Sequence, residues 1–248
     1  MNKNNPIYLS VVVPAYNESS NFQAGVLDLP LKYLKQQKYP WELIFVDDGS
    51  TDDTHNLLSK VMNRNIKVLQ IPHGGKAAAV TAGMLAAKGR YILFTDFDQS
   101  TPLHQVAEFI SAHKSGADVV IGVRTQTAKD TLVRKIRSWA FVTLVQVVAL
   151  PGIMDSQCGF KSFTHTAARK IFSKLKVCLP QGEIAGGYMG AFDVEVLFLA
   201  QKYGYAIAQV PVSWIKYWSD RLNIWKEPFQ MALDTFKIRL YGILGKYE

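Results

Sequence analysis

The chain has 248 residues, of which 48% are hydrophobic and 19% charged, and it carries a formal net charge of +8 at pH 7. This length and composition are sufficient for one large domain with its own core, and they exclude an intrinsically disordered protein. The excess of positive charge predicts an anionic partner, which is nucleic acid, anionic lipid or a phosphorylated substrate.

Neither a membrane span nor a secretory signal is visible in the sequence. No apolar run approaches the roughly 20 residues that cross a bilayer, and the polar residues 1–6 lack the apolar core of a signal peptide. The two cysteines, Cys158 and Cys178, lack the spacing of a metal site and are expected to be free thiols in a reducing compartment. We therefore expect the protein on the cytoplasmic side of a membrane.

Short β-prone runs alternate with helical patterns through the first half of the chain. Strands are expected at 7–13, 39–46, 66–71 and 91–95, with helices opening at Ser19, after Ser50 or Thr51, and at 77–87. Strand, helix, strand, helix is the rhythm of a parallel sheet with right-handed crossovers. The sequence therefore predicts an α/β fold with a mostly parallel sheet flanked by helices.

Two carboxylates follow the run at 91–95. Asp96 and Asp98 are separated by one residue, so in an extended chain they point the same way and can share a divalent cation or bracket a phosphate. Ligands of open α/β sheets sit outside the carboxyl ends of the strands, where these residues would lie. The alternative is a solvated turn in which one aspartate only caps the next helix.

Two glycines precede the alanine-rich helix at 77–87. Gly74 and Gly75 would expose backbone amides at the positive end of this helix, and Lys76 adds charge, so the segment can bind an anion. A simple turn fits the two glycines equally well. The spacing is not that of a P-loop, and no G-x-G-x-x-G occurs to indicate a dinucleotide site.

The regular alternation lapses in the second half. A helix at 103–114 and a strand at 118–123 lead to Arg124, and the basic residues 129–137 then precede an apolar run at 139–150. Together, residues 129–150 are a candidate membrane-interface helix, and for the apolar run a buried core helix fits equally well. A polar loop at 155–161, a helix that begins close to Asp193 and Glu195, and a strand at 206–214 follow.

The chain ends in an amphipathic helix, which is expected over 228–244. Lys237 and Arg239 lie off its apolar face, and that face carries Phe229, Leu233, Phe236, Leu240 and Leu244. We expect a catalytic domain over 1–222 and a C-terminal helical extension over 223–248.

Five motifs occur in a recognisable order. They are VVVPAYNE at 11–18, VDDGSTDDT at 46–54, GGKAAAV at 74–80, TDFDQSTP at 95–102 and SQCGFK at 156–161. With these motifs the chain resembles family 2 inverting glycosyltransferases of the GT-A fold over nearly its whole length. Within this family it is most similar to the enzymes that glucosylate dolichyl phosphate and bacterial polyprenyl phosphates.

The resemblance implies roles for individual residues. Catalysis would rest on Asp96, Asp98 and Arg124, and the metal, Mg²⁺ or Mn²⁺, on Asp98 with Asp96. Phe97 departs from the small residue usual between the two aspartates. The acceptor would be bound by Arg124, Arg134, Arg137, Gln157 and Lys161. The nucleotide sugar would be bound by Pro14, Ala15, Tyr16, Glu18, Val46, Asp48, Lys76, Asp96, Phe97, Asp98 and Arg221.

The implied reaction moves a hexose, expected to be glucose from UDP-glucose, to a polyprenyl or dolichyl phosphate. A phosphate oxygen is already anionic near neutral pH, so no strong general base is needed. A metal would stabilise the departing diphosphate while arginines screen the repulsion between phosphates. Asp193 or Glu195 would act as base only for a sugar hydroxyl, and we favour a role at a helix N-terminus for both.

The acceptor and the positive charge together predict peripheral binding to the cytoplasmic face of an anionic membrane, through residues 129–150 and the C-terminal helix. Transfer of mannose or an amino sugar, a saccharide acceptor, and a non-catalytic membrane-binding module are the alternatives. Nucleic acid is not expected as a partner, because the lysines and arginines are not interleaved with aromatic residues as in single-strand binders.

Overall fold

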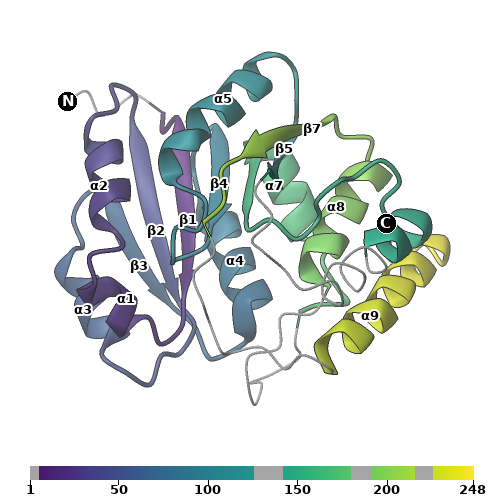
Figure 1. The fold of residues 1–248 in the computed structure, drawn as a ribbon, viewed down its shortest axis with the longest axis horizontal. Coiled ribbons are helices and arrows are strands. Elements are labelled where there is room, and N and C mark those ends of the chain that lie inside the picture. The colour runs from purple at the N-terminus through teal and green to yellow at the C-terminus, as the bar shows by residue number, and fades with distance from the viewer. Residues whose placement is uncertain (1–5, 126–141, 180–190, 216–225) are drawn as a thin grey trace.

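The computed structural model describes residues 6–125, 142–179, 191–215 and 226–248. A seven-stranded sheet forms its centre (Figure 1), and six of the strands run parallel to one another. Only β6 runs antiparallel, between β4 and β5. From one edge to the other, the strands are β3 (Ile66–Gln70), β2 (Trp41–Asp47), β1 (Leu9–Ala15), β4 (Tyr91–Thr95), β6 (Phe160–Thr164), β5 (Val119–Arg124) and β7 (Ile207–Val212). The expected α/β fold with a mostly parallel sheet is confirmed.

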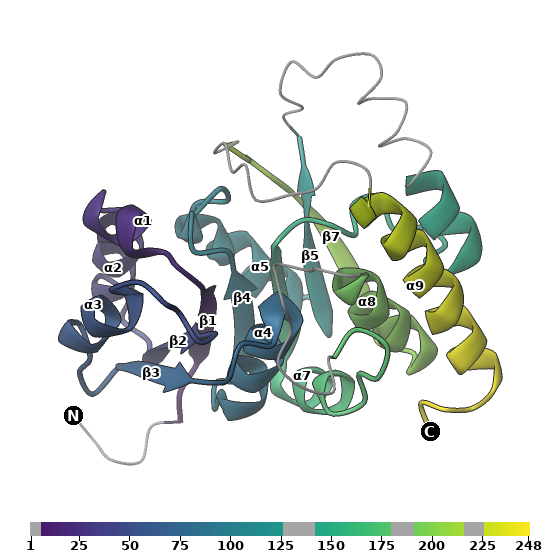
Figure 2. The same cartoon turned by 90° about the horizontal axis from the view of Figure 1, so that it is seen from below.

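Helices cover both faces of the sheet, which explains why its central strands are apolar on both sides. In β1, Val12 packs into the core on one face while Val11 and Val13 pack into the core on the other. The first core is completed by α4 (Gly75–Ala86), α7 (His165–Phe172) and α8 (Phe192–Lys202), and the second by α2 (Asp28–Lys35), α3 (Thr54–Lys60) and α5 (Val106–Lys114). Both layers are visible in Figure 2.

The first half of the chain follows the predicted order of elements. The helix expected from Ser19 is divided into α1 (Ser19–Gln23) and α2, because Gly25 adopts a positive φ of 76° between them. The helix expected at 103–114 begins with a short 3₁₀ turn, η1 (Leu103–Gln105), before α5. These differences shift boundaries and leave the architecture as predicted.

The loop predicted at 155–161 is shorter than expected. Phe160 and Lys161 already belong to β6, and α7 follows without interruption. Phe160 and Phe163 are fully buried and Lys161 is buried with them. Because a lysine and a Cys-Gly pair interrupt the apolar pattern, this strand is not recognisable from sequence periodicity.

The described part of the apolar run at 139–150 packs against the protein. Residues 142–148 are helical, and Val145, Ala149 and Leu150 are buried in the core that contains α8. For these residues the core-helix alternative is the correct one, while residues 129–141 lie outside the described part of the chain. Within the described ranges, every helix is too short or too polar to span a bilayer.

The C-terminal helix lies where the sequence predicts one, as α9 (Lys226–Ile243) packed on α8. The two helices approach closely at Gly242, where a Cβ atom would lie 2.3 Å from Cζ of Phe198. Beyond α9, the buried Tyr247 donates its hydroxyl to Glu195 at 2.8 Å. The chain end is therefore anchored to the rest of the structure, and the division at residue 222 stays a prediction.

Candidate active site

The loops that follow β1 and β2 are bonded into one unit. The side chain of Asn17 accepts hydrogen bonds from the backbone amides of Thr51, at 2.8 Å, and Asp52. In the opposite direction, Ser50 Oγ accepts from the amide of Asn17. Asn17 has a positive φ of 53°, a conformation that asparagine tolerates better than most residues. The carboxyl ends of these strands thus form a fixed rim beside Tyr16 and Asp48.

Asp48 occupies the N-terminus of α4. Its two carboxylate oxygens accept from the amides of Gly74 and Gly75 at 2.8 and 2.9 Å, and Oδ2 also bonds to Nδ1 of His73 at 2.9 Å. The anion that the two glycines were expected to bind is therefore a carboxylate of this chain. Lys76 follows directly as the second residue of α4.

Tyr16 and His73 form a stacked pair beside Asp48. Their ring centroids are 4.1 Å apart with an interplanar angle of 15°. Nε2 of His73 is buried and has no hydrogen-bond partner in the described structure. Sequence reasoning missed His73, although its position directly before the glycine pair is a signal that a loop side chain lies at this helix end.

Asp96 and Asp98 lie in a tight turn at the end of β4. The turn is closed by the amide of Gln99, which donates to the carbonyl of Asp96 at 3.3 Å. Gln99 itself adopts a positive φ of 53°. Asp98 Oδ1 accepts from the amide of Ser100 at 2.9 Å. Phe97, between the two carboxylates, is 3% exposed and packs near Phe45 in the core. The unusual phenylalanine therefore anchors the turn.

Asp96 is paired with Lys76. The ammonium Nζ lies 2.5 Å from Asp96 Oδ1, and burial, which would lower the pKa of Lys76, is outweighed by the charges of Asp96, Asp193 and Asp98, which raise it. Space for the Asp96 carboxylate depends on Gly159, where a Cβ atom would lie 2.0 Å from Asp96 Oδ2. Lys76 stays protonated and supplies a positive charge among three carboxylates.

The two aspartates fit a divalent cation that is shared with a substrate. Burial raises the pKa of the Asp98 carboxyl, and the charge of Asp96 adds to this rise. A further cation beside Lys76 would therefore stabilise the ionised form of both carboxylates. Among the described residues no group of three or more histidines, cysteines and carboxylates could hold a metal alone. Mg²⁺ is commonly bound by one or two carboxylates and completed by water and substrate phosphates, and this donor set matches that pattern.

Arg124, at the end of β5, is held by a residue that sequence reasoning missed. Its Nε and Nη2 donate to the two carboxylate oxygens of Asp155 at 2.7 and 2.9 Å, a bidentate pair. The guanidinium also lies 5.4 Å from the ring centroid of Trp214, which follows β7. Burial disfavours the charge, but Asp155 outweighs it and raises the pKa of Arg124. The guanidinium is therefore a fixed cation at this edge of the sheet.

The carboxylates considered as general bases are both engaged. Asp193 Oδ1 accepts from the fully buried Lys161 at 2.5 Å. Glu195 accepts from the amides of Lys176, Val177 and Cys178, in addition to the hydroxyl beyond α9. Both residues lie in the first turn of α8, as expected, and their bonds hold neighbouring segments in place.

The remaining predicted residues are distributed around this edge. Pro14 and Ala15 end β1, and Val46 is fully buried in β2, so neither its side chain nor its backbone is exposed to the site. The amide of Glu18 donates to Thr54 Oγ1, and the amide of Gln157 donates to Asp155. Arg134, Arg137 and Arg221 lie outside the described residues.

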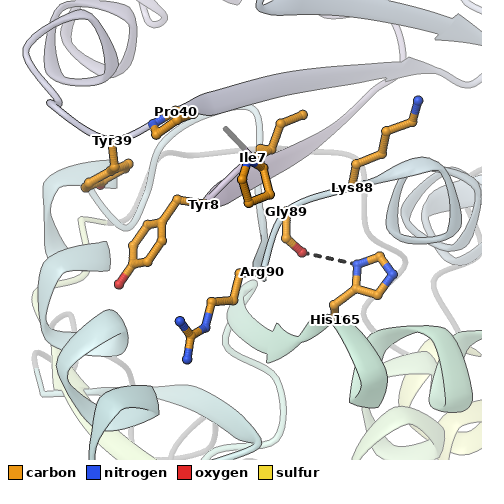
Figure 3. A pocket seen from close by; sticks show the side chains of 9 residues that line it. Ile7, Tyr8, Tyr39, Pro40, Lys88, Gly89, Arg90 and His165 are labelled. Atoms are coloured by element: carbon orange, nitrogen blue, oxygen red, sulfur yellow. Dashed lines mark hydrogen bonds between the residues drawn. The ribbon is translucent and has the colours of Figure 1, made fainter. Parts of the chain in front are cut away.

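A cleft at the other end of the strands, opposite their carboxyl ends, has different chemistry. Figure 3 shows this cavity of about 360 Å³, whose lining includes Tyr8, Tyr39, Arg90 and His165. These residues precede β1, β2 and β4 or follow β6, so they lie at the amino ends of the parallel strands. None of the predicted site residues is among the described residues that line this cleft.

Comparisons with known proteins show the family of the chain. The sequence profile described as "Glycosyl transferase family 2" matches residues 10–176. The chain is 35% identical to a dolichyl-phosphate beta-glucosyltransferase of Dictyostelium discoideum, over 98% of this chain and 77% of that protein. It is 34% identical to a dolichyl-phosphate beta-glucosyltransferase of Drosophila melanogaster, over 97% of this chain and 77% of that protein.

Among solved structures, the fold is similar to that of glucosyl-3-phosphoglycerate synthase from Mycobacterium tuberculosis. That structure contains Mn²⁺, UDP-glucose and phosphoglyceric acid. The similarity has a TM-score of 0.62 at 18% sequence identity and covers 97% of this chain and 79% of the other. At this identity the comparison establishes a shared fold.

Proposed function

The chain belongs to glycosyl transferase family 2, and from that premise we propose that it transfers glucose from UDP-glucose to a polyprenyl or dolichyl phosphate. The observation that carries this proposal is the match to dolichyl-phosphate beta-glucosyltransferases over 98% of the chain. In the reaction, a phosphate oxygen of the acceptor bonds to the anomeric carbon, and the bond from that carbon to the UDP oxygen breaks. One displacement inverts the anomeric centre.

The donor is bound at the ends of β1, β2 and β4. The stacked Tyr16 and His73 provide an aromatic wall beside Asp48, which suits a planar base. Asp98 and Asp96 would hold Mg²⁺ or Mn²⁺ against the diphosphate, and this cation would stabilise the negative charge of the departing UDP. Lys76, already charged beside Asp96, adds a second cation on the leaving-group side.

The acceptor phosphate is bound on the side of β5. Arg124 is oriented by Asp155, so its positive charge is in place before the acceptor arrives. Gln157, Lys161, Arg134 and Arg137 are proposed to assist on this side. Lys161 would act through Asp193 and the Cys158 carbonyl, which accept hydrogen bonds from its ammonium.

An anionic acceptor agrees with the state of the nearby carboxylates. Asp193 is neutralised by Lys161, and Glu195 is fully buried under four hydrogen bonds. Neither is placed to remove a proton from a sugar hydroxyl. A lipid phosphate needs no such step, since its oxygen is charged near neutral pH.

Calorimetric titration with UDP and GDP, each with and without Mn²⁺, tests the donor side. We expect UDP to bind more tightly with the metal, and we expect Asp98→Ala to remove this metal dependence. Glu108→Ala, which removes an exposed carboxylate on α5, is the matched control and should bind like the wild type. A preference for GDP would redirect the proposal to mannose, and metal-independent binding would contradict the role of Asp98.

A further inference from the structure

One face of α9 carries large apolar side chains that the described structure leaves uncovered. Between 48% and 70% of each is exposed. They recur at intervals of three and four residues, so they form one stripe about 22 Å long on an α-helix. Its members are Phe229, Leu233, Phe236, Leu240, Ile243 and Leu244. We call them the α9 stripe.

The opposite face of α9 attaches the helix to the protein. Asp234, Thr235 and Ile238 are buried on that face, and Gly242 abuts Phe198 of α8. Figures 1 and 2 both show α8 between α9 and the sheet. The α9 stripe therefore points away from the core even though it is the more apolar side of the helix.

Basic residues flank the stripe on both sides. With roughly 100° of turn per residue, Lys237 and Arg239 fall roughly 70–90° to either side of the stripe's centre. Both are exposed, and Asp234, the acidic residue among the described side chains of α9, is buried. An apolar stripe between cationic side chains is the pattern of a helix that lies in a lipid interface, where the basic heads reach the phosphates.

The connections of α9 relate it to the acceptor side of the site. In the described part of the chain α9 is the next helix after β7, and Trp214, two residues past β7, lies against Arg124. The helical residues 142–148 are the next described helix after β5 and lie beside α9 in both views, with Val147 80% exposed. The two helices that come next in the described chain after β5 and β7 therefore lie side by side.

We propose that the α9 stripe is the surface by which this protein docks on an anionic lipid bilayer, with the helix axis along the membrane plane. This inference rests on the proposed function, which places the acceptor in the membrane. A second copy of the chain is the less suitable occupant. Pairing two such stripes would bring Lys237 and Arg239 of one copy near those of the other, whereas anionic lipid complements them.

Vesicle binding by a stripe variant tests the proposal. The variant Leu233→Gln/Phe236→Gln/Leu240→Gln is compared with wild type by co-sedimentation with phosphatidylcholine vesicles that contain phosphatidylglycerol. We expect the partition coefficient to fall at least about tenfold, because three half-exposed apolar side chains no longer enter the interface. Lys237→Gln/Arg239→Gln should bind more weakly to these vesicles and unchanged to vesicles of phosphatidylcholine alone.

The matched control is Leu29→Gln/Met62→Gln. It removes two exposed apolar side chains that lie outside α9, at 77% and 51% exposure, and should bind vesicles like the wild type. If the triple variant does not fold, Phe236→Gln alone supplies the comparison. The proposal would be overturned if the wild-type protein did not bind vesicles, or if the stripe variant bound them as strongly as the wild type. It would also be overturned if light scattering showed a wild-type dimer that the triple variant converts to a monomer.

The assay also separates this inference from the proposed function. Glucose transfer to a short, water-soluble prenyl phosphate should be the same for wild type and the stripe variant, whereas transfer to a long-chain acceptor in vesicles should fall with vesicle binding. If neither acceptor is glucosylated by the wild type, the proposed function fails, and vesicle binding still decides the role of the α9 stripe.

Discussion

Replacing Gly159 by alanine should disable the site while leaving most of the fold intact. The new Cβ atom would lie 2.0 Å from Asp96 Oδ2 and 2.6 Å from Cγ. Restoring ordinary contact at 3.4 Å requires the carboxylate to move by about 1.4 Å. Such a movement breaks its 2.5 Å pair with Lys76 and displaces one of the two carboxylates at the end of β4.

The magnitude follows from this displacement. A misplacement of about 1 Å in a catalytic group can reduce the rate about 10²-fold, so we expect kcat/KM for glucose transfer to fall by about that factor. The free energy of unfolding should fall by only about 1–2 kcal/mol, since a side chain rather than backbone must move. Steady-state kinetics and urea denaturation measure the two effects separately.

A double-mutant cycle provides the decisive comparison. Asp96→Ala removes the three atoms that the new Cβ would strike, so Gly159→Ala should cost much less stability in that background. Gly242→Ala, which overpacks α9 against the side chain of Phe198 and away from the candidate active site, is the control for crowding alone and should keep its specific activity toward a water-soluble acceptor. An equal loss of stability in both backgrounds would refute the reasoning.

Three further predictions concern other parts of the molecule. The pKa of Glu42 is lowered, because hydrogen bonds from Lys67, Ser10 and the Lys88 amide outweigh the effect of burial. The ionised Glu42 therefore stabilises the fold above the ordinary pKa of 4.5, and this stabilisation is lost as the pH falls through the lower pKa of the folded state. Glu42→Gln should cost roughly 2 kcal/mol of unfolding free energy near neutral pH and progressively less in acid, and a pH-independent difference in urea denaturation would contradict this. Burial raises the pKa values of the Cys158 and Cys178 thiols. A thiol reagent should therefore label neither cysteine in the folded protein and both in denaturant, and fast labelling of the native protein would contradict their buried position. Asp155→Asn weakens the bidentate pair with Arg124 and should reduce kcat/KM for the acceptor about tenfold or more while calorimetric UDP binding is unchanged.

Much of the fold could be predicted because local patterns determine it. The strand at Tyr91–Thr95 is an apolar run between Arg90 and Asp96, and the structure places β4 there residue for residue. The motif residues follow strand ends, and parallel strands bring their carboxyl ends to one edge. That rule alone places Tyr16, Asp48 and Asp96 at the same end of the sheet.

The parts that could not be predicted depend on pairing between distant residues. Asp48 closes the N-terminus of α4 from 26 and 27 residues away, Asp155 orients Arg124 across 31 residues, and Tyr247 reaches Glu195 across 52. No local periodicity encodes such contacts. The outward direction of the α9 stripe is of the same kind, because a helical pattern identifies an apolar face without stating what will cover it.

The most direct test of the proposed activity is a transfer assay with the purified protein, a polyprenyl phosphate, Mn²⁺, and UDP-glucose or GDP-mannose as donor. The proposal predicts a glucosyl phosphopolyprenol from UDP-glucose, identified by mass spectrometry and shown to be the β anomer by nuclear magnetic resonance. Product from GDP-mannose alone, an α-linked product, or no transfer from either donor would contradict it.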